Sequence, residues 1–131
     1  MKDIKSEIEV FLESATISEK SRVATVRVRQ FDYDQWGFTA GYDVVADDPD
    51  YFLRELWWYL SIKPGLLFTE EGQYLSEDEE YRKQLKGKFR YFVDTAKFQG
   101  KVFRFACAAR LKRRGNPELT TVYGQAFVTV S

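Results

Sequence analysis

The chain has 131 residues, of which 44% are apolar and 17% aromatic, a composition that fits one compact domain and argues against disorder. It contains no histidine and a single cysteine, so Ser-His-Asp and Cys-His catalysis, histidine-based metal sites and internal disulfides are excluded. The 20 acidic and 20 basic residues cancel, but residues 1–80 hold 18 acidic and 8 basic residues, whereas residues 81–131 hold 2 and 12.

The opposite charges of the two parts have two explanations. Either the parts pack against each other and neutralise internally, or the basic part is displayed to an acidic partner such as nucleic acid. We expect a single domain spanning residues 1–131. The sequence has no export signal and no uncharged apolar run of the ~18 residues that a membrane span needs, and its lone cysteine favours the cytoplasm.

The first segment, residues 4–14, carries apolar side chains whose spacing fits two structures. Ile8, Val10 and Leu12 alternate as the apolar residues of a strand do. Over so short a stretch, the two-residue period of a strand and the 3.6-residue period of a helix fit almost equally well. We favour a helix of about 11 residues and leave the strand open. The helical face would hold Ile4, Ile8, Phe11 and Leu12.

A strict alternation of apolar and polar residues follows and predicts a β-hairpin. Residues 22–31 and 38–45 each place their apolar side chains on one face, which is typical of half-buried strands. Asp and Gly residues in the connection favour a tight turn held by side-chain hydrogen bonds, so we expect antiparallel pairing.

Two helices are predicted next. Asp48-Pro49-Asp50 offers an N-cap, a proline for the first turn and a carboxylate at the positive end of the dipole, so the first helix is expected to run to about Ile62. Ser76 and Glu79 form a capping box before the second helix, which ends at Gly100. The apolar stripe of the second helix would hold Tyr81, Leu85, Phe89, Phe92 and Ala96.

A second hairpin is predicted at the end of the chain, where residues 101–111 and 119–130 again alternate. The order of elements predicts an α+β fold, in which two hairpins form one antiparallel sheet of about four strands and two to three helices pack on one face. This arrangement would bury the apolar side of the sheet and of each helix.

The predicted helix over residues 50–62 is apolar nearly all round, which suggests a binding surface. If its leucines and Trp57 face the core, an aromatic and arginine patch remains outside, and these residue types dominate binding hot spots. The alternatives are a helix sandwiched inside the fold and a groove beside residues 66–68 for a small apolar ligand. The predicted partner-binding residues are Phe52, Arg54, Trp58 and Tyr59.

Basic residues between positions 82 and 114 suggest a second surface. They fall on the predicted second helix or at the end of the closing hairpin, where we expect exposure, and together they would bind anions such as phosphates. A solvated helix face and a charged edge strand are the favoured explanation, because the acidic part of the chain would repel the same phosphates. These residues are Arg82, Lys83, Lys86, Arg90, Arg110, Lys112, Arg113 and Arg114.

These patterns predict a non-enzymatic, cytoplasmic protein-binding or adaptor domain, whose partner is another protein or a second copy of the chain. The alternative is a nucleic-acid-binding accessory protein that uses the basic residues. An enzyme working through carboxylate, Tyr or Lys chemistry ranks third, because no pattern points to a catalytic group, a metal site or a cofactor.

Overall fold

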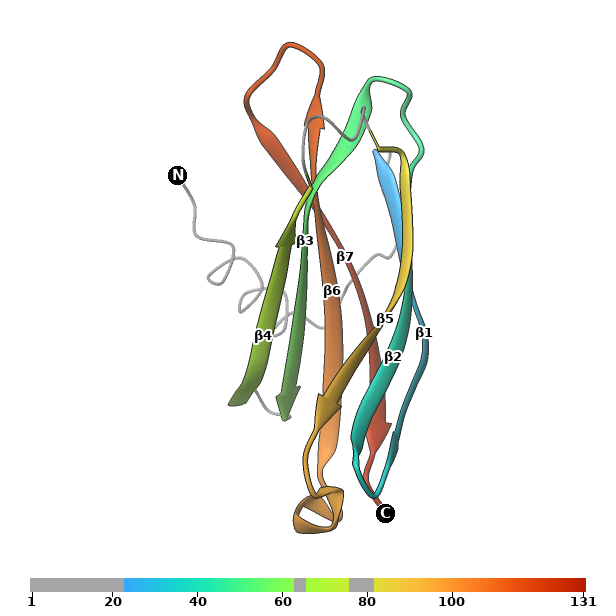
Figure 1. The fold of residues 1–131 in the computed structure, drawn as a ribbon, viewed down its shortest axis with the longest axis vertical. Coiled ribbons are helices and arrows are strands. Elements are labelled where there is room, and N and C mark those ends of the chain that lie inside the picture. Colours follow the sequence, from blue (N-terminus) through green and yellow to red (C-terminus); the bar gives the residue numbers. More distant parts are fainter. Residues whose placement is uncertain (1–22, 63–65, 76–81) are drawn as a thin grey trace.

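The structure, a computed structural model, describes residues 23–62, 66–75 and 82–131. The described chain is almost entirely β-strand, and its strands form two antiparallel sheets that face each other (Figure 1). The three-stranded sheet has the order β1-β2-β5, and the four-stranded sheet has the order β4-β3-β6-β7. The strands are β1 (Ala24–Asp34), β2 (Gly37–Ala46), β3 (Tyr51–Ile62), β4 (Leu66–Tyr74), β5 (Gln84–Phe92), β6 (Val102–Arg113) and β7 (Leu119–Thr129).

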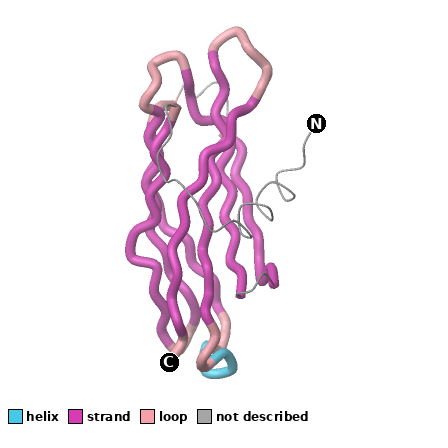
Figure 2. The backbone as a smooth tube through the Cα atoms, turned by 180° about the vertical axis from the view of Figure 1, so that it is seen from behind, coloured by secondary structure: helices cyan, strands magenta, loops and turns pink. Residues whose placement is uncertain are grey.

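The predicted α+β fold is wrong, because the described residues contain no α-helix. The helical structure among them is one short 3-10 helix, Thr95–Phe98, at the end of the sandwich where the C-terminus also lies (Figure 2). The first predicted helix is β3 instead, and residues 84–92 of the second predicted helix are β5. The segment 4–14 and the predicted capping box lie outside the described residues. Within the described chain, no helix has the length and apolar character that a membrane crossing requires.

The sequence of β3 lacks the alternation of a typical strand because β3 is apolar on both faces. It pairs with β4 on one side and β6 on the other, and a central strand buried on both faces loses the alternation that identifies a strand. The apparent N-cap belongs to a turn, where the Asp48 carboxylate accepts a hydrogen bond of 2.9 Å from the Asp50 amide. Such turns use the same polar side chains as helix caps.

The strand β5 shows how one spacing fits two structures. Leu85 and Phe89, four residues apart, share a face of a helix and also a face of a strand. In the structure both point inward, and Phe89 joins the core. Gly87 lies between them under the ring of Tyr42, where an added Cβ would overlap the Tyr42 hydroxyl. A glycine in a strand interior is typical of such a close approach.

Both predicted hairpins are confirmed, but they lie in different sheets. β1 pairs with β2 in the three-stranded sheet, and β6 pairs with β7 in the four-stranded sheet. The prediction of a single sheet failed because β3, β4 and β5 are strands that extend each hairpin separately.

The two sheets approach closely where β1 lies along β7. A Cβ at Gly124 would lie only 2.5 Å from the carbonyl oxygen of Val26, so a glycine is needed for this approach. At the far end of the same strands, the Ser131 amide donates a hydrogen bond of 2.9 Å to the Tyr33 hydroxyl. We call this contact between the first and last described strands the seam.

The apolar core lies between the sheets and is dominated by phenylalanine rings. Phe38 of β2 packs on Phe103 of β6 with ring centroids 4.2 Å apart. Phe105, two residues along β6, packs on Phe89 of β5 at 4.9 Å and on Phe31 of β1 at 5.8 Å. Burying each such ring contributes roughly 1.5–3 kcal/mol, so these contacts are a main attraction between the layers.

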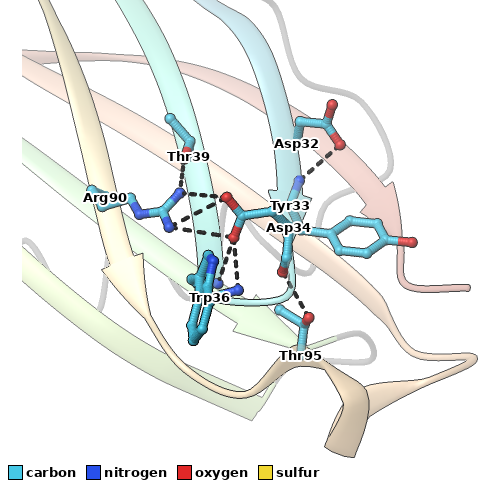
Figure 3. A network of polar contacts seen from close by, with 8 residues as sticks. Asp32, Tyr33, Asp34, Trp36, Thr39, Arg90 and Thr95 are labelled. Atoms are coloured by element: carbon cyan, nitrogen blue, oxygen red, sulfur yellow. Dashed lines mark hydrogen bonds and ion pairs between the residues drawn. The ribbon is translucent and has the colours of Figure 1, made fainter.

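The turn between β1 and β2 is organised by one carboxylate (Figure 3). Asp34 Oδ1 accepts hydrogen bonds from the amides of Trp36 at 2.7 Å and Gly37 at 3.1 Å, which confirms the predicted side-chain-stabilised turn. The same carboxylate forms an ion pair with Arg90 of β5 at 3.3 Å, and Arg90 also donates to the Thr39 hydroxyl at 2.5 Å. Three strands are thereby joined at one end of the sheet.

This network predicts a loss of stability in acid. The Trp36 amide, with the Arg90 guanidinium, holds the pKa of Asp34 below its ordinary value of 3.8. A lowered folded-state pKa means that the contribution is complete above pH 3.8 and is lost as the pH falls through the lower folded-state value. We expect Asp34→Asn to lower the urea midpoint at pH 7, and this difference from the parent chain to shrink in acid. A difference that stays constant down to about pH 2 would contradict the role of the charge.

Candidate functional site

The candidate site is the outer face of the four-stranded sheet. Phe105 and Cys107 of β6 belong to the core, so Ala106 and Ala108, which alternate with them, point outward. The register with β3 places Tyr59 beside Ala106. We call this surface the aromatic-arginine face, and its members are Glu55, Trp57, Tyr59, Ser61, Tyr74, Arg104, Ala106, Ala108, Arg110, Tyr123, Gln125 and Phe127.

The centre of the face is a floor of small, buried side chains. Ala106 and Ala108 are 0% exposed and Ser61 is 2% exposed, and the larger Tyr59 beside them is also 0% exposed. The three-stranded sheet lies on the opposite side of this sheet (Figure 1). Small and large side chains are thus buried together at the centre of this side of the sheet.

The rim of the face is aromatic. Trp57 lies across Gly72 of the neighbouring strand β4, where a Cβ would be 2.5 Å from the indole ring. Tyr74 of β4 meets Trp57 edge to face, with ring centroids 5.8 Å apart, and is 72% exposed. On the other side of the floor, Phe127 of β7 is 44% exposed. Exposed aromatic rings with fixed neighbours can bind a partner at little entropic cost.

Arg110 is the main polar group near the floor. It is 8% exposed, and its Nη1 lies 3.9 Å from Oε1 of Glu55, an oxygen that already accepts a hydrogen bond of 2.9 Å from the Trp57 indole. Its Nε is buried without a hydrogen-bond partner among the described residues, and the same holds for Oε1 of Gln125. A buried donor without an acceptor costs about 1–3 kcal/mol, so an additional acceptor here would stabilise the protein.

Arg104 lies at the other end of β6 on the same face. Its guanidinium carbon lies 4.9 Å from the ring centroid of Phe127, a cation-π contact, and it is 8% exposed. Burial lowers the pKa of Arg104, but a guanidinium keeps its charge at neutral pH. Two buried guanidinium groups thus flank the alanine floor.

The predicted partner-binding residues divide between the two faces of β3. Tyr59 and Phe52 belong to the outer side, and Arg54 at the bulge of β3 lies over the Phe52 ring at 5.9 Å. Trp58 points the other way, is 7% exposed in the core and packs on Tyr42 with centroids 5.3 Å apart. The predicted helix placed Trp58 outside with Arg54 and Trp57 toward the core. The two-residue period of a strand instead places Trp57 on the outer side with Tyr59.

The predicted anion-binding residues converge only in part. Lys86 and Arg90 lie on β5 of the three-stranded sheet, while Arg110 is on the outer face of the four-stranded sheet. The expected exposure of the hairpin end is correct for Arg113 and Arg114 but wrong for Arg110, which is buried beside Glu55. Five of the eight predicted residues, including those of the hairpin end, lie near the turns at one end of the sandwich: Arg82, Lys83, Lys112, Arg113 and Arg114.

Lys83 has a structural role at that end. Its ammonium group donates a hydrogen bond of 2.6 Å to the carbonyl of Pro49 and another to the carbonyl of Tyr51. It therefore holds the turn between β2 and β3 against the start of β5. A lysine whose hydrogen bonds are used in this way contributes little to an anion-binding surface.

The acidic and basic parts of the chain neutralise each other locally. Asp34 and Glu55 from the acidic part pair with Arg90 and Arg110 from the basic part. Asp43 forms an ion pair with Arg29 and also lies opposite Lys86 in the strand register. The first explanation of the uneven charge, internal neutralisation, therefore accounts for these residues.

Cys107 lies in the core between the sheets, fully buried, and burial raises the pKa of its thiol. A protonated, inaccessible thiol is a poor nucleophile and metal ligand. Among the described residues, no group of three or more Asp, Glu or Cys side chains is arranged to hold a metal ion.

A scan against protein families and searches of curated proteins and of solved structures found no match to this chain.

Proposed function

We propose that this chain is a non-enzymatic, cytoplasmic protein-binding domain and that the aromatic-arginine face is its binding surface. The observation that supports this function is the combination of tryptophan, tyrosine and arginine around a floor of alanine. These three residue types carry most of the binding energy at protein interfaces, and small central residues allow another chain to approach the sheet closely.

The chemistry of the face favours a particular kind of partner. The alanine floor and aromatic rim suit apolar side chains, while the Nε of Arg110 needs an acceptor. A carboxylate is the strongest acceptor for a guanidinium. The expected partner is therefore an apolar protein segment that carries acidic residues.

A cytoplasmic setting agrees with the cysteine chemistry. Cys107 is the single cysteine of the chain, and its thiol is buried in the core rather than available for a bridge. A domain that depends on core packing without disulfides fits a reducing compartment.

Nucleic-acid binding is the less favoured alternative. Phosphate recognition needs several cations on one surface, whereas the basic residues here are divided between two faces and one end. Arg90 and Arg110 are also engaged by carboxylates.

The proposal predicts that one charge on the floor removes partner binding. Ala108→Arg places a long cation at a site that is 0% exposed, and we expect about a tenfold or greater loss of captured protein from native lysate. Ala96→Arg, the same change at an exposed position of the 3-10 helix, is the matched control and should capture partner like the parent chain.

Quantitative mass spectrometry of the captured proteins, with and without nuclease, separates the two functions. Capture that resists nuclease and disappears with Ala108→Arg, while circular dichroism shows an intact fold, supports the protein-binding function. Capture that is lost on nuclease treatment would favour nucleic acid, and equal capture by the parent and Ala108→Arg would refute the proposed surface.

A further inference from the structure

We propose that a second copy of this chain binds along β4 and β5, the edge strands on the side opposite the seam, and that the two copies form a symmetric dimer. The inference goes beyond the proposed function and does not depend on it. β4 ends the four-stranded sheet and β5 ends the three-stranded sheet, and each has one neighbour among the described strands (Figure 1). An edge strand leaves backbone N–H and C=O groups that can pair with a further strand.

The two edges carry opposite charges. Glu70 and Glu71 of β4 are exposed, and so are Lys86 and Lys88 of β5. Within the part of the chain that the structure describes, Glu70 and Lys88 form no ion pair. Charged residues on an edge normally prevent pairing, and here they prevent it between two copies of the same strand, because like charges would meet. Pairing of β4 with β5 brings opposite charges together.

The directions of the two edge strands suit antiparallel pairing. Val26 of β1 lies against Gly124 of β7. Further along the chain in both cases, Tyr33 meets Ser131, so β1 and β7 run parallel. Neighbouring strands within each sheet are antiparallel, so β5 has the direction of β1, and β4 has the direction opposite to β7. β4 and β5 therefore run in opposite directions.

The two edge strands also lie at matching heights along the sandwich. Tyr42 of β2 packs on Trp58 of β3 with ring centroids 5.3 Å apart, which aligns the two sheets at this point. Gly87 of β5 lies opposite Tyr42, and Glu71 of β4 lies opposite Trp58. Gly87 and Glu71 are therefore at about the same height.

A two-fold axis parallel to the strands, between the layers, satisfies both edges at once. Rotation about this axis exchanges the layers but keeps the direction and the height of every strand. β4 of one copy then lies antiparallel beside β5 of its partner, and β5 lies beside the partner's β4. Each sheet of three strands joins a sheet of four from the partner, and the interface is closed because both copies use the same surface.

The heights decide which side chains meet in this dimer. Glu71 lies beside the partner's Gly87, which has no side chain to clash with it. In the antiparallel register the next pair is Glu70 with the partner's Lys88. Lys88 alternates with the inward Phe89, and Glu70 is opposite an outward residue of β3, so both side chains lie on the outer side of the joined sheet. The symmetry forms this pair of opposite charges twice.

The test measures the mass of the full chain by sedimentation velocity over a range of concentrations, and we expect a monomer–dimer equilibrium. Glu70→Lys and Lys88→Glu each place like charges at both contacts, so each should raise the dissociation constant by roughly tenfold or more. Lys97→Glu, the same change at an exposed position of the 3-10 helix, is the matched control and should dimerise like the parent chain.

Mixing the two charge variants makes the test sharper. The Glu70→Lys and Lys88→Glu proteins each repel their own kind, but a mixed pair has opposite charges at both contacts. We expect the mixture to form a heterodimer about as stable as the parent dimer, and the chain with both substitutions to dimerise by itself. This restoration excludes misfolding as the cause of the loss. Amide hydrogen exchange in residues 66–74 and 84–92 should slow when the dimer forms.

A chain that stays monomeric at every concentration measured would overturn the inference. A dimer that is insensitive to both charge variants would overturn it too, because another surface would then hold the copies together. Masses that grow beyond a dimer would indicate an open series of contacts between β4 and β5 and would contradict the closed, symmetric form. None of these results bears on partner capture by Ala108→Arg.

Discussion

Replacing Phe105 with alanine is expected to destabilise the fold by about 3–5 kcal/mol, the usual cost of deleting a large ring from a packed core. Phe105 is 0% exposed on β6, and its ring contacts Phe89 and Phe31 of the opposite sheet. The substitution therefore removes contacts to two strands of the other layer at once. Urea unfolding followed by tryptophan fluorescence measures the loss.

Phe92→Ala is the matched control for this prediction. Phe92 is 74% exposed at the end of β5, where it contacts the guanidinium of Arg90 at 4.8 Å, so its loss should cost about 1 kcal/mol or less. If the two alanine variants unfolded at the same urea concentration, the core would not lie between the sheets as described.

Gly37→Ala is expected to destabilise the fold by about 2–5 kcal/mol, combining backbone strain with overpacking. Gly37 has a φ of 148°, and a Cβ there would overlap the carbonyl oxygen of Tyr91 in the neighbouring strand. A backbone carbonyl in a ladder cannot move aside as a flexible side chain can. Thermal and urea unfolding both report the effect.

Gly100→Ala separates the two causes, because Gly100 has a φ of 80° but nothing within 4 Å of an added Cβ. Its cost should be about 1–2 kcal/mol from backbone strain alone. Equal losses for both glycines would mean that the contact with Tyr91 has no energetic effect.

The hairpins could be predicted because their information is local. In β1, Ala24 and Val26 alternate with Thr25 and Arg27, and the carboxylate of Asp34 accepts hydrogen bonds from amides only two and three residues further along the chain. The pairing of β3 with β6 and of β5 with β2 joins distant segments, and no local pattern states it. In β5, the need for Gly87 follows only from the position of Tyr42 in another strand.

The candidate site was found in part for the same reason. Tyr59 and Phe52 were singled out by residue type, which does not depend on the fold. The period decided the rest: a helix placed Trp58 outside, whereas the strand turns it inward and exposes the side of Trp57. The pairing of Arg110 with Glu55 depends on the register of β3 and β6 and could not be read from either segment.

The seam between β1 and β7 has a consequence for synthesis of the protein on the ribosome. The first described strand, β1, can complete its contacts only after the last described strand, β7, has emerged, because Val26 lies against Gly124 and Tyr33 against Ser131. Until then the phenylalanine-rich inner faces have no permanent cover. Contacts between residues so far apart in the sequence make folding slow, in the range of milliseconds to seconds for β-sandwich proteins. The nascent chain therefore depends on chaperones to protect its exposed aromatic strands.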